Sequence, residues 1–156
     1  MTKRLLCGML CVSATLISAC ADTDADEGEG PPKITFLTPY GPPKNPFSPA
    51  VQVGDMLYLA GQLGTDSTGT LVTGGIEPET RQTLTNIADV LAKTGSSMDR
   101  VVKCTAFLAD MKEWPAMNGV YRTYFPKNFP ARSALGATGL ALNARVEIEC
   151  IAVVAR

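Results

Sequence analysis

Histidine is absent from all 156 residues of this chain. Its absence removes the Ser-His and Cys-His pairs of many hydrolases, together with the commonest zinc ligand. The sequence also lacks a glycine-rich phosphate loop ending in Lys and then Ser or Thr. Any chemistry must therefore depend on carboxylates or on Arg, Lys, Tyr, Ser, Thr or Cys side chains.

Long apolar runs are scarce. The run from Leu5 to Ile17 has thirteen residues, which is too short for a membrane-spanning helix of ~20 residues. Two basic residues precede it and two small residues follow it, which is typical of a secretory signal. Ile17-Ser18-Ala19-Cys20 also resembles the lipobox of bacterial lipoproteins, which implies that residues 1–19 are a lipoprotein-type signal peptide.

Under this interpretation Cys20 carries the lipid, and the protein is anchored in the cell envelope and faces the periplasm. Two or more acyl chains anchor a protein stably, whereas one binds only marginally. The alternative is an ordinary cleaved signal and a soluble periplasmic product. Residues 20–32 contain five acidic residues and no basic one, so we expect a disordered tether.

Residues 33–156 are long enough for one domain with its own core but too short for two. This segment has twelve Lys and Arg against ten Asp and Glu, without a basic stripe, so nothing favours a nucleic-acid partner. It keeps two cysteines, Cys104 and Cys150. Export permits a disulfide between them, but two small buried apolar side chains are the favoured interpretation.

Apolar periodicity predicts an α+β domain with two helices on one face of a mixed sheet. The expected order is a strand, a hairpin around Gly54-Asp55, a helix, a strand, a second helix and the C-terminal strands. The expected ranges are 33–37 and 47–60 for the strand and hairpin, about 77–93 and 111–125 for the helices, and 99–108 and 145–154 for later strands. Gly61 to Gly64 indicates a bulge or a close backbone approach.

Two charged residues near the C-terminus are open to two interpretations. Alternation from Arg145 to Cys150 puts Glu147 on the charged face of a strand, where it meets solvent in the plainer interpretation. In the other, Glu147 and Arg132 line a pocket for a small acid, because a guanidinium grips a carboxylate with two parallel hydrogen bonds. The pattern alone does not decide between them.

Several motifs occur together in one order along the chain. They are Gly74-Gly75-Ile76, Thr80 to Ile87, Val101 to Met111, Asn118 with Tyr121, Phe129-Pro130-Ala131-Arg132-Ser133, and Val146 to Val153. In these motifs the chain resembles the RidA/YjgF family of reactive-intermediate deaminases, from about Phe47 to Val154. The resemblance implies a chorismate-mutase-like α+β fold, assembled as a homotrimer with ligand pockets in the clefts between subunits.

The resemblance also implies a function. Arg132 would hold the substrate carboxylate, and Glu147 would position or activate the attacking water. Substrates would be 2-imino acids or their enamine tautomers, released as 2-keto acid and ammonia without metal or organic cofactor. Gly61, Asn118 and Ala134 would contact the substrate, although Asn118 is equally well explained as a helix-surface amide.

Alanine replaces polar groups of active relatives at three expected pocket positions: Ala50, Ala60 and Ala134. These changes predict a more apolar pocket that accepts a bulkier imine, or one that binds without turnover. The rival hypothesis is therefore a trimer of the same fold that binds a small acid or client proteins without catalysis. Some relatives act on RNA, but the nearly neutral domain argues against that activity here.

Overall fold

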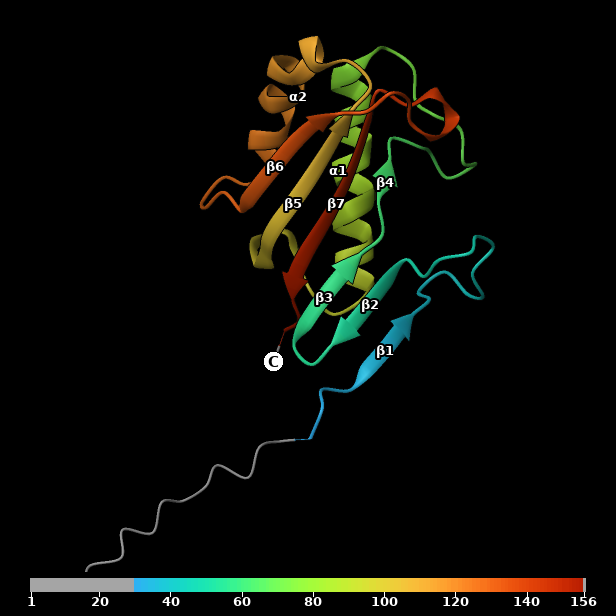
Figure 1. The fold of residues 1–156 in the computed structure, drawn as a ribbon, viewed down its shortest axis with the longest axis vertical. Helices are drawn as coiled ribbons and strands as arrows, with labels where there is room; N and C mark the ends of the chain where they lie inside the picture. The colour runs from blue at the N-terminus through green and yellow to red at the C-terminus, as the bar shows by residue number, and fades with distance from the viewer. Residues whose placement is uncertain (1–29, 156) are drawn as a thin grey trace, which may run out of the picture. The chain divides into compact units, whose positions relative to one another are not determined.

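Seven strands form one mixed sheet in the computed structural model, which describes residues 30–155 (Figure 1). Its order is β1-β2-β3-β7-β5-β6, and the short β4 also pairs with β7. The strands are β1 (Ile34–Leu37), β2 (Ala50–Val53), β3 (Met56–Leu59), β4 (Gln62–Leu63), β5 (Val101–Leu108), β6 (Ala131–Gly136) and β7 (Val146–Val153). This arrangement confirms the expected α+β class.

Three expectations concern residues outside the described range: the signal peptide, lipid attachment at Cys20, and the acidic tether up to residue 29. Within residues 30–155, no helix is both long and apolar enough to cross a membrane.

Helix α1 (Ile76–Lys93) confirms the first predicted helix within one residue at each end. Gly75 precedes it with a φ of 91°, and Gly95 follows its last turn with a φ of 81°. Both values lie in the left-handed region that glycine adopts without strain. Leu84, Ile87 and Leu91 are buried along one side of α1, as their spacing predicts.

The second predicted helix, 111–125, is wrong as a single element. Only α2 (Trp114–Tyr121) is α-helical, with a 3-10 turn on each side, η2 (Met111–Glu113) and η3 (Arg122–Tyr124). Asp110 accepts a hydrogen bond from the backbone N–H of Lys112 and so starts η2 separately. Two further 3-10 turns, η1 (Met98–Arg100) and η4 (Ala141–Asn143), precede β5 and β7.

The alternation predicted for the C-terminal strand is confirmed. Val146, Ile148 and Cys150 of β7 are buried, whereas Glu147 is half-buried and Glu149 is exposed. The buried residues face α1, which lies across one side of the sheet (Figure 1). The other side of the sheet carries Glu147 and Glu149 and is called the open face below.

Strands β3 and β4 both pair antiparallel with β7, one after the other. Tyr58 pairs with Ile151 and Gln62 with Ile148, so three residues of one strand lie opposite two of the other. The extra residue is a β-bulge, which confirms the irregularity expected near Gly61. It also separates the short β4 from β3 and places β4 beside Glu147.

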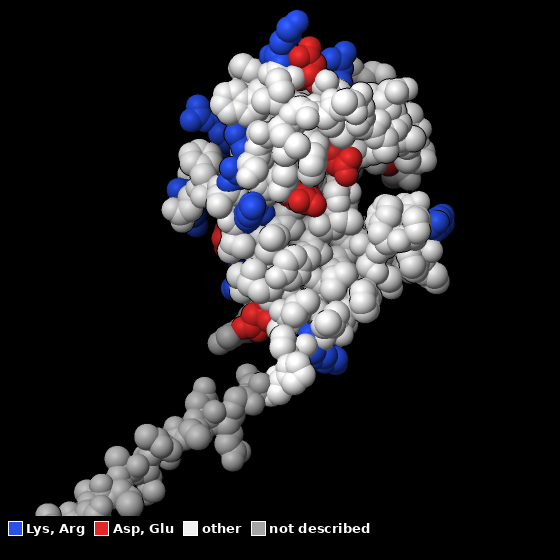
Figure 2. All heavy atoms as spheres, in the orientation of Figure 1, with Lys and Arg blue, Asp and Glu red and all other residues white. Residues whose placement is uncertain are grey.

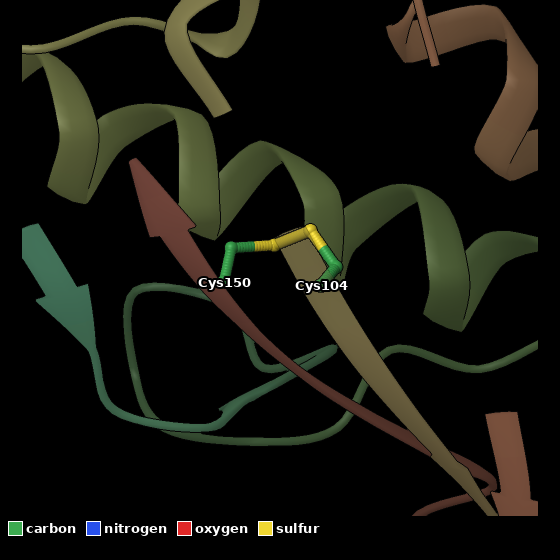
Figure 3. The surroundings of a disulfide bond; sticks show 2 residues. All are labelled: Cys104 and Cys150. Carbon is green, nitrogen blue, oxygen red and sulfur yellow. A yellow bond between two sulfur atoms is a disulfide. The ribbon is translucent and has the colours of Figure 1, made fainter. Parts of the chain in front are cut away.

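Cys104 and Cys150 form a disulfide, so the favoured interpretation of two unpaired cysteines is wrong (Figure 3). The register of β5 against β7 places these residues directly opposite each other, on the buried side of the sheet. Directly paired side chains in antiparallel strands are close enough for a disulfide. The bond therefore joins two neighbouring strands, β5 and β7, beneath α1 (Figure 3).

Strands β5 and β6 are parallel and are connected through α2. A parallel pair needs such a crossover, and the helix then covers one side of the sheet. The open face is broad and mostly uncharged, with Lys and Arg gathered along the edge beside β6 (Figure 2). Large apolar side chains are exposed on this face, among them Tyr58 and Leu135.

Candidate active site

A cavity of about 440 Å³ lies between α2 and the start of β6. Arg132 and Asn118, two of the residues singled out from the sequence, both line it. Its remaining lining residues are Trp114, Pro115, Gly119, Tyr121, Arg122, Phe129 and Pro130. The volume lies within the range of small-molecule sites, roughly 300–1,000 Å³. The lining combines a few polar groups with aromatic walls.

Two aromatic rings of α2 hold the guanidinium of Arg132. Its Cζ lies 4.5 Å from the ring centroid of Tyr121 and 5.9 Å from that of Trp114. Cation–π attraction fixes the guanidinium at these distances without occupying its N–H donors. Neither of the two ion pairs in the described part of the chain includes Arg132. The donors therefore remain available to an incoming carboxylate.

Burial raises the pKa of Tyr121 to about 12, although the charge of Arg132 acts in the opposite direction. The phenol is thus neutral at physiological pH. It offers its ring to Arg132 and does not compete as an anion for the guanidinium.

Glu147 lies on the opposite, open face of the sheet. Its carboxyl group covers the backbone of Gly61, where an added Cβ would lie 2.1 Å from Oε1. A side chain at position 61 would collide with the Glu147 carboxyl group, so glycine is required there. The family resemblance implied instead that Gly61 contacts the substrate. Burial, and secondly the charge of Glu149, raise the pKa of Glu147 above its ordinary value.

Arg132 and Glu147 do not meet within one chain. Arg132 pairs with Cys104 of β5 and Glu147 pairs with Phe107, and paired residues on neighbouring strands share a face. Positions 104 and 107 of one strand face opposite sides. A pocket lined by both residues therefore requires two copies of the chain, and the expected pockets between subunits stay a prediction.

The three alanines occupy different environments. Ala50 is fully buried in the core, so the expectation that it lines a pocket is wrong. Ala60 is half-buried and precedes Gly61 at the bulge. Ala134 shares the face of Arg132 but packs partly against the core, outside the set of residues that line the cavity.

Sequence reasoning missed several residues of the site. The helical spacing of Trp114 and Tyr121 gives no sign that the two rings flank a guanidinium. Glu79 was not singled out at all, yet it is a buried carboxylate, 5% exposed. Within residues 30–155, no three Cys, Asp or Glu side chains are grouped closely enough to hold a metal ion.

The sequence profile of the family described as "Endoribonuclease L-PSP" matches residues 40–154. A protein from Dermatophagoides farinae named 2-iminobutanoate/2-iminopropanoate deaminase is 44% identical over 125 residues, which is 79% of this chain and 98% of the relative.

Solved structures agree with the sequence comparison. One from Entamoeba histolytica, described as a putative endoribonuclease L-PSP, superposes with a TM-score of 0.72 at 40% identity, covering 78% of this chain and all of the other. The structure of TdcF from E. coli with bound serine gives a TM-score of 0.69 at 26% identity, covering 77% of this chain and 98% of that one.

Proposed function

Because this chain belongs to the RidA/YjgF/L-PSP family, we propose that it hydrolyses small 2-imino and 2-enamino acids to 2-keto acids and ammonia. One observation carries the proposal: the guanidinium of Arg132, which forms no ion pair within residues 30–155, lines a ligand-sized cavity. A separate half-buried carboxylate, Glu147, supports it, because burial raises its pKa. The first group suits a substrate carboxylate, and the second suits proton transfer. The names of the relatives support three- and four-carbon substrates.

The Arg132 cavity and the Glu147 carboxylate combine in a cleft between two copies of the chain. In a homotrimer, the open face of one copy, with Glu147 and Gly61, packs beside the Arg132 cavity of the next. The exposed apolar side chains Tyr58 and Leu135 support an interface on this face. Each of these two side chains is 44% exposed in the single chain.

The proposed reaction is the addition of water to a C=N bond. Arg132 holds the substrate carboxylate, and Asn118, which lines the same cavity, orients it. Glu147 accepts a proton from water as the oxygen bonds to the imine carbon. Glu147 returns this proton to the nitrogen, and the hydroxyl proton of the adduct also passes to the nitrogen. The C–N bond then breaks, and ammonia and the 2-keto acid leave. An enamine first gains a proton on carbon and loses one from nitrogen to become the imine.

We further propose that the mature protein is lipid-anchored at Cys20 in the cell envelope. The sequence motif carries this proposal, and the Cys104–Cys150 disulfide supports it because disulfides persist in oxidising compartments. Cys20→Ser is expected to move the protein from the membrane fraction to the soluble fraction, measured by immunoblotting of separated fractions. An unchanged distribution would contradict the lipid anchor.

A second candidate function is binding of a small acid without turnover. The lining of the Arg132 cavity favours it, because none of those residues is acidic. Such a protein gains thermal stability with a keto acid but forms no product, since a ligand that binds only the folded state stabilises it.

The pH profile of keto-acid formation from 2-iminobutanoate tests the proposed function. Glu147 acts as a base only when ionised, so kcat is expected to fall as pH drops through its raised pKa. Glu149→Gln removes the neighbouring charge, lowers the pKa of Glu147 and moves the acidic limb to lower pH. Glu77→Gln, an equivalent change at an exposed carboxylate in the first turn of α1, should leave the limb unchanged.

Two outcomes oppose the proposal. A wild-type protein that gains thermal stability with 2-ketobutyrate but forms no keto acid at any pH is a binding protein. If the acidic limb of the kcat pH profile is the same in wild type and Glu149→Gln, a group other than Glu147 transfers the proton.

A further inference from the structure

Glu79 in the first turn of α1 reaches across to the start of β7. Its Oε1 accepts hydrogen bonds from the backbone N–H of Arg145 at 2.6 Å and of Val146 at 3.2 Å. Those two residues directly precede Glu147. Hydrogen bonds to a charged acceptor are roughly twice as strong as neutral ones, and at a buried carboxylate they offset the loss of water.

The backbone around Glu79 leaves it little freedom. Gly64 follows β4, and a Cβ added there would lie 2.5 Å from the carbonyl oxygen of Glu79 and 2.6 Å from its Cγ. Glu79 therefore packs directly against the segment that pairs with the beginning of β7.

Asn86, a second polar residue of α1, fixes the strand that pairs with Glu147. Asn86 Nδ2 donates to the carbonyl oxygens of Leu63 and Thr65, each at 2.9 Å. Leu63 is the residue of β4 that pairs with Glu147. Side chains from one helix thus fix both strands at the position of the carboxylate, one through Glu79 and one through Asn86.

The turn that leads into β7 is strained. Leu142 and Asn143 have φ values of 59° and 60°, in the left-handed region that is unfavourable for a branched side chain such as leucine. Strained backbone persists only where its surroundings hold it. The hydrogen bonds from Arg145 and Val146 to Glu79 close this turn at its exit.

We propose that Glu79 is a positioning residue for Glu147: by fixing the first two residues of β7, it sets where the Glu147 carboxylate meets the attacking water. The inference rests on the proposed function. It differs from a purely structural role, because a carboxylate displaced by about 1 Å lowers the rate about 100-fold without weakening substrate binding. Arg132, which binds the substrate, lies on the other face and belongs to a separate half of the site.

The test compares kcat and KM for 2-iminobutanoate in three variants. Glu79→Ala is expected to lower kcat by about 10- to 100-fold with little change in KM. Glu79→Gln retains an acceptor oxygen at the same reach and is expected to restore most of kcat. Ile87→Val removes one methylene from the buried side of α1; it destabilises the fold and leaves kcat near that of wild type.

Hydrogen exchange at the amides of Arg145 and Val146 gives a readout independent of turnover. These amides are expected to exchange at least about 10-fold faster in Glu79→Ala than in Glu79→Gln, because only the alanine removes their acceptor. A wild-type kcat in Glu79→Ala, or an equal loss in Ile87→Val, overturns the inference while the proposed function stands. If wild type itself lacks turnover, the proposed function fails, and equal exchange rates in the two Glu79 variants then overturn the inference separately.

Discussion

Mixing two inactive variants should restore activity. Arg132→Ala removes the carboxylate clamp and Glu147→Gln removes the base, which contributes about 10²- to 10⁴-fold. When both chains are expressed together and assemble at random, about one cleft in four receives Arg132 from one copy and Glu147 from the next. Activity per total protein should therefore reach about a quarter of wild type. The geometric reason is that the two residues face opposite sides of one sheet.

Co-assembly of wild type with the double variant Arg132→Ala/Glu147→Gln is the matched control. Clefts shared between copies retain about a quarter of the activity, whereas clefts formed within one chain retain about a half. Both mixtures are measured by keto-acid formation from 2-iminobutanoate. If co-expressed single variants give no more than the sum of their separate activities, the shared cleft is wrong.

Loss of the disulfide is expected to have the largest effect on stability. The bond closes a loop between residues 46 positions apart in sequence. Chain-entropy arguments give about 4 kcal/mol of free energy of unfolding for a loop of that length. Cys104→Ala/Cys150→Ala should thus unfold at a much lower urea concentration. Its free energy of unfolding should also depend more steeply on urea, because the unfolded chain without the cross-link exposes more surface. The transition is followed by circular dichroism at fixed protein concentration.

A reducing agent distinguishes the effect of losing the disulfide from the effect of replacing the two cysteine side chains. Dithiothreitol should shift the wild-type transition toward that of the double alanine variant and leave the variant itself unchanged. A wild-type transition that is insensitive to dithiothreitol, in protein shown by thiol titration to be reduced, would contradict a stabilising role for the disulfide.

Local sequence signals predicted most of the secondary structure. Pro78 lies in the first turn of α1 and Gly95 follows its last turn, as the preferences of proline and glycine predict. Period-two alternation identified the buried side of β7. Gly61 marked the bulge, since glycine in a strand indicates irregularity or close approach. Each of these signals depends on neighbours within a few positions, which are visible in one sequence.

The features missed from the sequence depend on register. Neither the pairing of Cys104 with Cys150 nor that of Arg132 with Cys104 follows from composition or periodicity, because the strands are joined through long connections. Likewise, Glu79 bonds to backbone groups 66 and 67 positions away. The family resemblance supplied Arg132 and Glu147, but only the sheet register showed that they face apart.

Under the proposed function, an isolated chain is expected to be inactive, because its sheet presents Arg132 to one side and Glu147 to the other. Each single chain carries the guanidinium of one proposed site and the carboxylate of another, so it completes neither site. Under the proposed homotrimer with clefts between copies, activity per molecule is expected to rise with protein concentration and to level off once assembly is complete. The proposed site would then have a threshold in protein amount without any regulatory ligand.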